Sequence, residues 1–162
     1  EELRARGIRL VSLLGVRAET PWLLGGVKST SYAVNMAAEA EAKRRGADDA
    51  VFLGSGDVVL EGPVTNVWWR YDDVLYTPAL ELGILAGVTR ATLVEEAATA
   101  GYEVREGVFP LEHMAKAQEA FTSSSIREVM PVVELDGDPL GDGAPGRAAR
   151  ELQDALRRAA ER

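Results

Sequence analysis

The chain has 162 residues, 46% of them hydrophobic and 27% charged, which is the composition of a single globular domain. Its formal net charge of −8 argues against nucleic acid or an anionic membrane as the main partner, since binding either usually needs a basic surface. The absence of cysteine and the single histidine, His113, exclude disulfides, a thiolate nucleophile and a histidine-rich metal site.

The chain begins with a predicted strand, a loop and a helix. Residues 7–16, GIRLVSLLGV, are rich in β-forming side chains and predict a strand. Residues 17–28 predict a loop, because they contain a proline and a pair of glycines. Residues 31–45 are rich in alanine and end in Lys-Arg-Arg before Gly46, which predicts a helix with a basic C-terminus.

The middle of the chain predicts two hairpins and a second helix. Residues 50–62 have a turn sequence at 55–57, and residues 66–78 have another at 72–73. Residues 83–101 predict a glycine-rich loop that enters an amphipathic helix.

The remaining elements are a strand after Gly101, a short helix that begins near Pro110, two strands around a serine turn in 119–137, and a terminal helix at 147–161. Strands and helices do not alternate strictly. We therefore predict an α+β (irregular α/β) fold.

Lys28 follows two glycines in an apolar run, directly before the first predicted helix. It is one of three lysines, and the other two, Lys43 and Lys116, lie in polar helical segments. The local sequence alone favours a surface lysine whose stem lies along apolar neighbours. A desolvated lysine is also a candidate chemical group, so the rest of the chain must decide between the two.

Three further stretches contain groups that packing does not require. Glu61 ends a predicted strand, where a carboxylate is either an exposed turn residue or a buried acceptor for a protonated ring nitrogen. Residues 87–90, GVTR, open a helix whose N–H groups could bind an anion. Residues 122–125, TSSS, form either a solvated turn or a hydroxyl cradle for phosphate or carboxylate. Taken singly, each stretch favours the structural explanation.

Together, these groups match what pyridoxal 5'-phosphate requires from a protein. Its aldehyde needs a lysine for a Schiff base, its pyridine nitrogen needs an acidic partner, and its phosphate needs N–H and hydroxyl donors. We therefore hypothesise a pyridoxal-phosphate site.

The order and spacing of four stretches resemble the class IV aminotransferases, the fold-type-IV pyridoxal-phosphate enzymes. This family includes branched-chain aminotransferase, D-amino-acid aminotransferase and aminodeoxychorismate lyase, and the resemblance covers residues 7–153. The stretches are VKSTSYAVNM from Val27, VLEGPVTNVWW from Val59, LYTPALELGILAGVTRATLVEEA from Leu75 and FTSSSIREVMPVVELDG from Phe121.

The resemblance implies a role for individual residues around the cofactor. Lys28 matches the Schiff-base lysine, which also moves the proton between substrate and cofactor. Glu61 matches the partner of the pyridinium nitrogen, and Tyr32 resembles the tyrosine that hydrogen-bonds the phenolic oxygen. Asn66 is expected to support the loop, and Arg90 to pair with a nearby carboxylate.

The same resemblance implies contacts to the cofactor's ring and phosphate. Leu85 matches the leucine packed on one face of the pyridine ring. Val88 and Thr89 match the pair whose N–H groups, with the threonine hydroxyl, hold the phosphate. Ser125 matches a hydroxyl that also reaches the phosphate, and the N–H of Ile126 is expected near the phosphate or the substrate carboxylate.

Three functional hypotheses remain open. The first is an aminotransferase acting on an amino acid and a 2-keto acid. The second is aminodeoxychorismate lyase, which forms 4-aminobenzoate and pyruvate in the folate pathway, because KSTSYAVNM and VLEGP are similar to lyase-type members. The third is a non-catalytic fragment or scaffold of the same fold, against which the intact Lys28 and Glu61 argue.

The resemblance also implies the fold of a D-amino-acid-aminotransferase-like large domain, a mixed sheet or pseudo-barrel flanked by helices, and a domain organisation. Residues 1–162 are expected to be a single cofactor-binding large domain, and the family's smaller N-terminal domain is missing from them. That domain supplies a phosphate-binding arginine and one wall of the substrate pocket, so we expect this chain, which starts without methionine, to be a fragment. We further expect a homodimer in the cytoplasm, with a small-molecule substrate, no metal, no nucleic acid and no membrane partner.

Two features are assigned to structure rather than function. Trp68 and Trp69 occupy successive strand positions, so one ring is expected in the core and the other on a dimer or interdomain surface. His113 is expected to be an ordinary helix residue.

Overall fold

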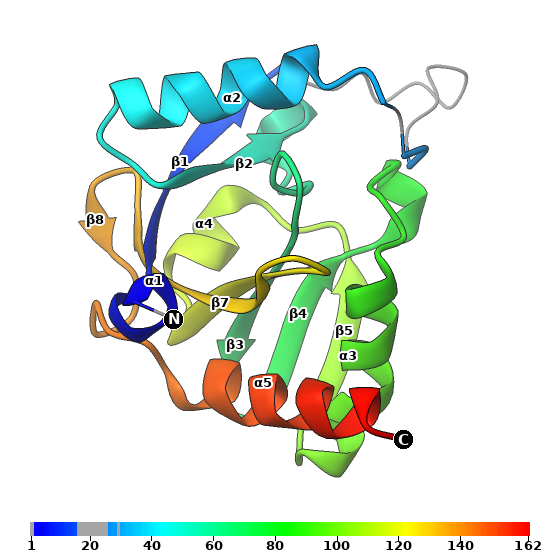
Figure 1. The fold of residues 1–162 in the computed structure, drawn as a ribbon. Coiled ribbons are helices and arrows are strands. Elements are labelled where there is room, and N and C mark those ends of the chain that lie inside the picture. The colour runs from blue at the N-terminus through cyan, green and yellow to red at the C-terminus, as the bar shows by residue number, and fades with distance from the viewer. Residues whose placement is uncertain (1, 16–25, 29) are drawn as a thin grey trace.

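A computed structural model describes residues 2–15, 26–28 and 30–162 of the chain (Figure 1). The helices are α1 (Glu2–Arg6), α2 (Ala33–Arg44), α3 (Val88–Thr99), α4 (Leu111–Ala115) and α5 (Arg147–Ala160). The strands are β1 (Ile8–Leu14), β2 (Asp49–Leu53), β3 (Asn66–Tyr71), β4 (Val74–Pro78), β5 (Glu103–Gly107), β6 (Glu119–Ser124), β7 (Glu128–Leu135) and β8 (Asp138–Pro139). No helix within these residues is long and apolar enough to cross a membrane.

The described strands form one eight-stranded sheet in the order β2-β1-β7-β6-β3-β4-β5, with β8 paired to β7. β1 pairs in parallel with β2 and β7, and β4 pairs in parallel with β5. The central strands β7, β6, β3 and β4 pair antiparallel. The predicted mixed sheet flanked by helices is therefore confirmed.

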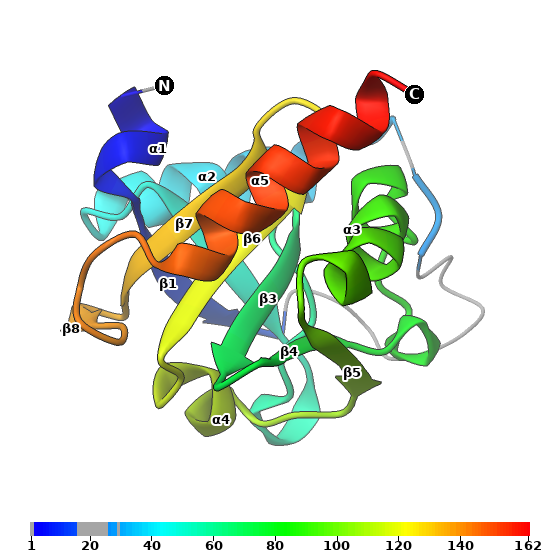
Figure 2. The same cartoon turned by 90° about the horizontal axis from the view of Figure 1, so that it is seen from below.

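Helices cover the sheet on both sides, as Figures 1 and 2 show. α3 and α5 lie together over the central strands, where Leu93 and Leu152 pack with Trp68 and Phe121. α2 lies over β1 and β2, at the opposite end of the molecule from α5, against a separate apolar cluster that includes Phe52. α4 packs on the other face of the sheet, where Met114 joins the cluster of Trp69. Burial of these apolar surfaces is the main source of the fold's stability.

The two tryptophans of β3 point to opposite faces of the sheet, and both are fully buried, at 0% exposure. Trp68 donates its indole N–H to Ser123 Oγ at 2.9 Å, and Trp69 donates to His113 Nδ1 at 2.8 Å. The expectation that one ring lies on a dimer or interdomain surface is wrong, because apolar side chains cover both faces of the sheet.

His113 lies on α4 among the rings of Trp69, Tyr71, Tyr76 and Phe109. Burial lowers the pKa of His113, which suits its role as the hydrogen-bond acceptor for Trp69. The expectation of an ordinary structural histidine agrees with this packing.

The segment 50–62 differs from the predicted hairpin in its second half. β2 ends at Leu53, residues 55–57 form a short 3-10 turn, and an isolated antiparallel bridge joins Leu53 to Val59. The returning chain is not a regular strand, but it keeps three hydrogen bonds to the first arm: Gly54 N–H donates to Val58 O at 2.8 Å, Leu60 N–H to Phe52 O at 2.9 Å and Phe52 N–H to Glu61 O at 2.8 Å. The Glu61 side chain faces the loop before α3, where it accepts the Leu85 N–H. Most of the predicted loop 17–28 lies outside the described residues.

Candidate functional site

Glu61 and Asn66 fix the loop that precedes α3. Glu61 is 3% exposed, so it is not an exposed turn residue. Leu85 N–H donates to Glu61 Oε2 at 3.0 Å, and the Asn66 amide donates to Leu85 O at 2.9 Å. Because both polar groups of Leu85 are held, its side chain is presented from a defined position. This agrees with the supporting role expected for Asn66.

The N-terminus of α3 leaves backbone donors unused. Its N-cap is Gly87, which makes no side-chain hydrogen bond, and the first backbone bond runs from Ala91 N–H to Gly87 O at 3.0 Å. No side chain in the described part of the chain accepts the N–H groups of Val88, Thr89 or Arg90. A helix start with open donors carries partial positive charge and attracts anions.

Gly87 is required by its close neighbour. A Cβ at this position would overlap Asn66 Oδ1, so a larger residue would displace the amide that holds Leu85. The neighbouring side chains differ in exposure, since Val88 is 78% exposed and the Thr89 side chain is buried at the start of the helix. Val88 and Thr89 therefore present their N–H groups from a helix turn whose position is fixed by the close contact of Gly87 with Asn66.

Arg90 has a structural role, as expected. Its guanidinium donates to Pro78 O at 3.0 Å, forms an ion pair with Glu106 and lies 5.8 Å from the centre of the Trp68 ring. These contacts fasten α3 to β4 and β5.

The turn between β6 and β7 lies beside this loop. Ser123 of β6 pairs with Asn66 of β3, so the serines that follow it continue past the Asn66 side chain. Ser125 is exposed and Ile126 is 94% exposed at the tip of the turn. The Arg127 N–H donates to Ser124 Oγ at 3.1 Å, which closes the turn.

Lys28 and Tyr32 belong to the segment that leads into α2. Lys28 is exposed, and Gly26, two residues before it, has a φ of +78° and lies so close to Ile84 that a Cβ would be 3.0 Å from Ile84 O. Tyr32 is the N-cap residue of α2 and is 41% exposed. The Asn35 amide donates to Pro63 O, which ties α2 to the segment after Glu61.

The strand register places six of the predicted residues at one end of the sheet, in three loops: Glu61, Leu85, Val88, Thr89, Ser125 and Ile126. Gly26, two residues before Lys28, lies against Ile84 of the loop that contains Leu85. No group of three or more histidine or acidic side chains within the described ranges is placed to hold a metal ion. The roles given to the individual residues stay predictions.

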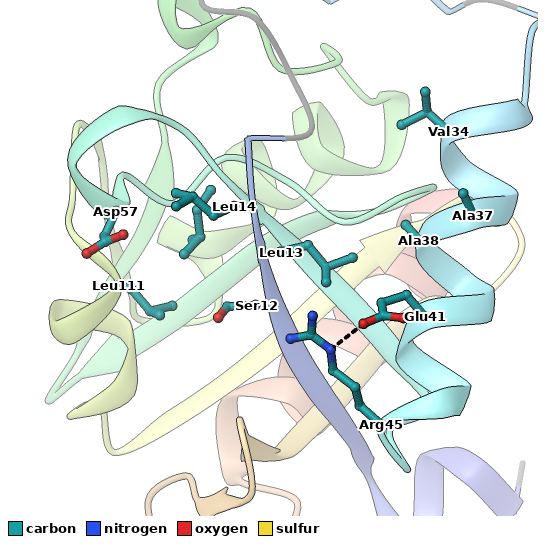
Figure 3. A pocket seen from close by; sticks show the side chains of 11 residues that line it. Ser12, Leu13, Leu14, Val34, Ala37, Ala38, Glu41, Arg45, Asp57 and Leu111 are labelled. Atoms are coloured by element: carbon teal, nitrogen blue, oxygen red, sulfur yellow. Dashed lines mark hydrogen bonds and ion pairs between the residues drawn. The ribbon is translucent and has the colours of Figure 1, made fainter.

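A groove of ≈ 750 Å³ lies elsewhere, between α2 and the end of β1 (Figure 3). Val34, Ala37 and the ion pair of Glu41 with Arg45 form its α2 wall, and Leu13 and Leu14 form its β1 wall. Its lining includes none of the predicted site residues. The groove is therefore separate from the predicted site.

Comparison with known proteins places the chain among enzymes of one family. A family model described as amino-transferase class IV matches residues 1–135. The chain is 35% identical over 141 residues to aminodeoxychorismate lyase of Bacillus subtilis, covering 87% of this chain and 48% of that protein. It is 31% identical over 135 residues to D-alanine aminotransferase of Bacillus licheniformis, covering 83% of this chain and 47% of that protein.

Solved structures agree with this result. A fold IV transaminase from Curtobacterium pusillum superposes with a TM-score of 0.82 at 38% identity, over 96% of this chain and 53% of that one. A branched-chain aminotransferase from Thermobaculum terrenum in its PLP form has a TM-score of 0.88 at 30% identity, over 94% and 50% of the two chains. The chain therefore spans about half the length of the relatives that it matches.

Proposed function

The chain belongs to the class IV aminotransferase family, and we propose that it is the cofactor-holding domain of a pyridoxal-phosphate-dependent aminotransferase that moves an amino group between an amino acid and a 2-keto acid. The observation that carries the proposal is the convergence of a buried carboxylate, Glu61, with the open helix start at Val88 and Thr89. Leu85 connects Glu61 with this helix start, because its N–H donates to the Glu61 carboxylate and it lies three residues before Val88.

The residues present suit pyridoxal phosphate. A buried carboxylate favours a protonated ring nitrogen, and the N–H groups of a helix start favour a dianionic phosphate. The Thr89 and Ser125 hydroxyls add neutral donors, and the Leu85 side chain is available to pack on the ring. When bound, this cofactor withdraws electrons from the substrate α-carbon.

The proposal gives individual residues of this chain a role toward the cofactor and the substrate. Lys28 Nζ holds the cofactor covalently and then takes and returns the proton at the substrate α-carbon. Glu61 keeps the ring nitrogen protonated. Val88, Thr89, Ser125 and Ile126 bind the phosphate, and Tyr32 donates to the phenolic oxygen.

The proposal also extends to the assembled protein. Since the chain matches about half of its relatives' length, we include a second, smaller domain that completes the substrate pocket, a homodimer and a cytoplasmic location. The amino acid and keto acid that react are set by that completed pocket.

Aminodeoxychorismate lyase activity is a second candidate, and the observation that favours it is the 35% identity to the Bacillus subtilis lyase. The two activities use the same lysine and carboxylate, so the products distinguish them. A lyase releases pyruvate from aminodeoxychorismate without a keto-acid acceptor, whereas an aminotransferase consumes an acceptor in proportion to the amino donor.

Borohydride trapping tests the cofactor proposal. The chain is incubated with pyridoxal phosphate, reduced, digested and analysed for the added mass. We expect the label on the Lys28 peptide and its loss in Lys28→Ala, while the matched Lys43→Ala and Lys116→Ala variants keep it. A label spread over all three lysines, or one that survives Lys28→Ala, contradicts the proposal.

A further inference from the structure

Glu128 has an unusual backbone conformation at the edge of the proposed phosphate site. It is the first residue of β7, it pairs with Ser124 across the β6–β7 turn, and its φ is +55°. A hairpin loop of three residues commonly places glycine in this left-handed position, because a side chain there is strained. A glutamate in its place indicates that the side chain has a use that outweighs the strain.

The Glu128 carboxylate is held by three side chains from the two ends of the chain. Arg157 Nη2 of α5 lies 3.0 Å away, and Arg4 Nη2 of α1 lies 3.1 Å away. Gln153 Nε2 of α5 donates to the same oxygen at 2.7 Å. Burial opposes the ionisation of Glu128, but the hydrogen bond and charge of Arg157 and the charge of Arg4 outweigh it and lower its pKa.

The same side chains also bond to the backbone on either side of Glu128. Arg4 donates to Arg127 O at 2.8 Å and to Val129 O at 3.0 Å. Gln153 Oε1 accepts the Val129 N–H at 2.9 Å. Arg4 and Gln153, which both contact the Glu128 carboxylate, therefore also fix the backbone from Arg127 to Val129.

The Arg127 side chain anchors the opposite side of the turn. Its Nη1 lies 2.6 Å from Asp49 Oδ2, and Asp49 is only 1% exposed at the start of β2. The turn is thus clamped at its base, while Ser125 and Ile126 at its tip face outward.

We propose that Glu128 is a positioning residue for the phosphate-binding turn. Its carboxylate, clamped by Arg4, Arg157 and Gln153, fixes the turn in the position that presents the Ser125 hydroxyl and the Ile126 N–H to the phosphate. This inference rests on the proposed function and adds to it a residue that touches neither cofactor nor substrate.

A comparison of two ligands tests the inference, because pyridoxal has the ring and aldehyde of pyridoxal phosphate without the phosphate. The dissociation constants of both are measured by calorimetry for the unchanged chain and for Glu128→Gly, in which glycine keeps the left-handed backbone without strain. Arg157→Ala is the second variant, since it reaches the turn through Glu128. Asp72→Gly is the matched control: Asp72 is an exposed acidic residue with a φ of +51° in the β3–β4 turn.

We expect Glu128→Gly to lower the preference for pyridoxal phosphate over pyridoxal about tenfold, with pyridoxal binding unchanged, as typical for the loss of a residue that orients a ligand-binding group. Arg157→Ala should lower the preference less, and Asp72→Gly should leave it unchanged. The inference is overturned if the unchanged chain prefers pyridoxal phosphate and Glu128→Gly and Arg157→Ala keep that preference, or weaken both ligands equally. If the unchanged chain shows no preference, the proposed phosphate site itself is wrong, and the role of Glu128 with it.

Discussion

Helices α3 and α5 lie over the same side of the sheet, and each starts at a glycine N-cap that makes no side-chain hydrogen bond. At α5, the buried Glu119 of β6 accepts the N–H groups of Ala148 and Ala149 at 3.1 and 2.7 Å. At α3, the neighbouring strand side chain is Asn66, which bonds to Leu85 O and accepts none of the first helical N–H groups in the described structure.

Gly87 and Gly146 explain why two similar helix N-termini have different polar neighbours. A Cβ on Gly146 would overlap the Glu119 carboxyl group, and a Cβ on Gly87 would overlap the Asn66 amide. Each glycine therefore admits a polar side chain from the sheet. A carboxylate neutralises one helix start from within the protein, whereas an amide leaves the other start available to an external anion.

The largest expected effect on stability comes from removing the Glu119 carboxylate, which caps the N-terminus of α5. Glu119→Ala removes the acceptor of two helical N–H groups and leaves Arg70, which is 3.0 Å from Glu119 and 13% exposed, without that partner. We expect a loss of about 3 kcal/mol in the free energy of unfolding, measured by urea denaturation. The control is Glu112→Ala, which breaks an exposed ion pair with Lys116 and should have a much smaller effect. Equal losses in the two variants would contradict the capping role.

The variants Gly146→Ala and Gly87→Ala distinguish an effect on folding stability from an effect on pyridoxal-phosphate binding. Gly146→Ala should lower the free energy of unfolding by about 2 kcal/mol, because it crowds a buried carboxylate, and should leave pyridoxal-phosphate binding unchanged. Gly87→Ala should weaken pyridoxal-phosphate binding, because it displaces the amide that holds Leu85. Urea denaturation and calorimetry on both variants check the two outcomes, and the reverse pattern would remove the distinction between the helices.

Asn66→Ala tests how far the open helix start depends on its support. Loss of the bond to Leu85 O should cost about 1 kcal/mol of unfolding free energy and weaken pyridoxal-phosphate binding. Gln118→Ala, which removes exposed hydrogen bonds to Arg70 and Asp72, is the control for stability without binding. Unchanged binding in Asn66→Ala would show that the loop needs no such support.

The smallest effect concerns a third carboxylate that accepts backbone N–H groups. Asp48 accepts the Arg9 N–H at 2.9 Å and pairs with the side chains of Arg6 and Arg9. Burial opposes its ionisation, but the hydrogen bonds from Arg6 and Arg9 outweigh it and hold the pKa of Asp48 below its ordinary value.

Because the folded pKa is lowered, this contribution is present above the unfolded pKa of Asp and is lost as the pH falls through the folded pKa. We expect Asp48→Asn to lower the unfolding free energy by roughly 1 kcal/mol at neutral pH, after screening of its half-exposed arginine partners. The difference from the unchanged chain should shrink below about pH 4 in acid-unfolding curves. A difference that stays constant to low pH would assign the effect to packing.

The sequence was sufficient for the elements that local patterns determine. The hairpin turn at 72–73, the helix after Gly87 and the terminal helix all agree with the structure. Their boundaries follow from turn residues, helix periodicity and glycine stops, which are properties of neighbouring residues.

Features that depend on contacts between distant segments could not be predicted from the sequence. The full burial of Trp68 requires α3 and α5 to cover that face, and these helices are 20 or more positions away. Glu119 lies in an apolar strand without any motif, and its pairing with α5 follows only from the fold. The clamp on Glu128 joins both ends of the chain, although a charged residue directly after the Ser-Ser-Ser-Ile-Arg turn was a signal that could have been noted.

The candidate site residues were assigned because a resemblance connected four separated stretches. Physical reasoning about Glu61 left two alternatives, and the burial of Glu61 excludes the exposed turn residue, while its role toward a ring nitrogen stays a prediction. The same reasoning about residues 87–90 indicated an anion site but could not show that Asn66 leaves the helix start open.

The central claim is that α3, and not α5, presents its N-terminus to the phosphate. An amide NMR titration of the chain with pyridoxal phosphate tests it most directly, because each helix start is observed separately. We predict that the amide signals of Val88 and Thr89 shift in proportion to binding, while those of Ala148 and Ala149 stay in place. Shifts at Ala148 and Ala149, or binding without any change at Val88 and Thr89, would contradict the account.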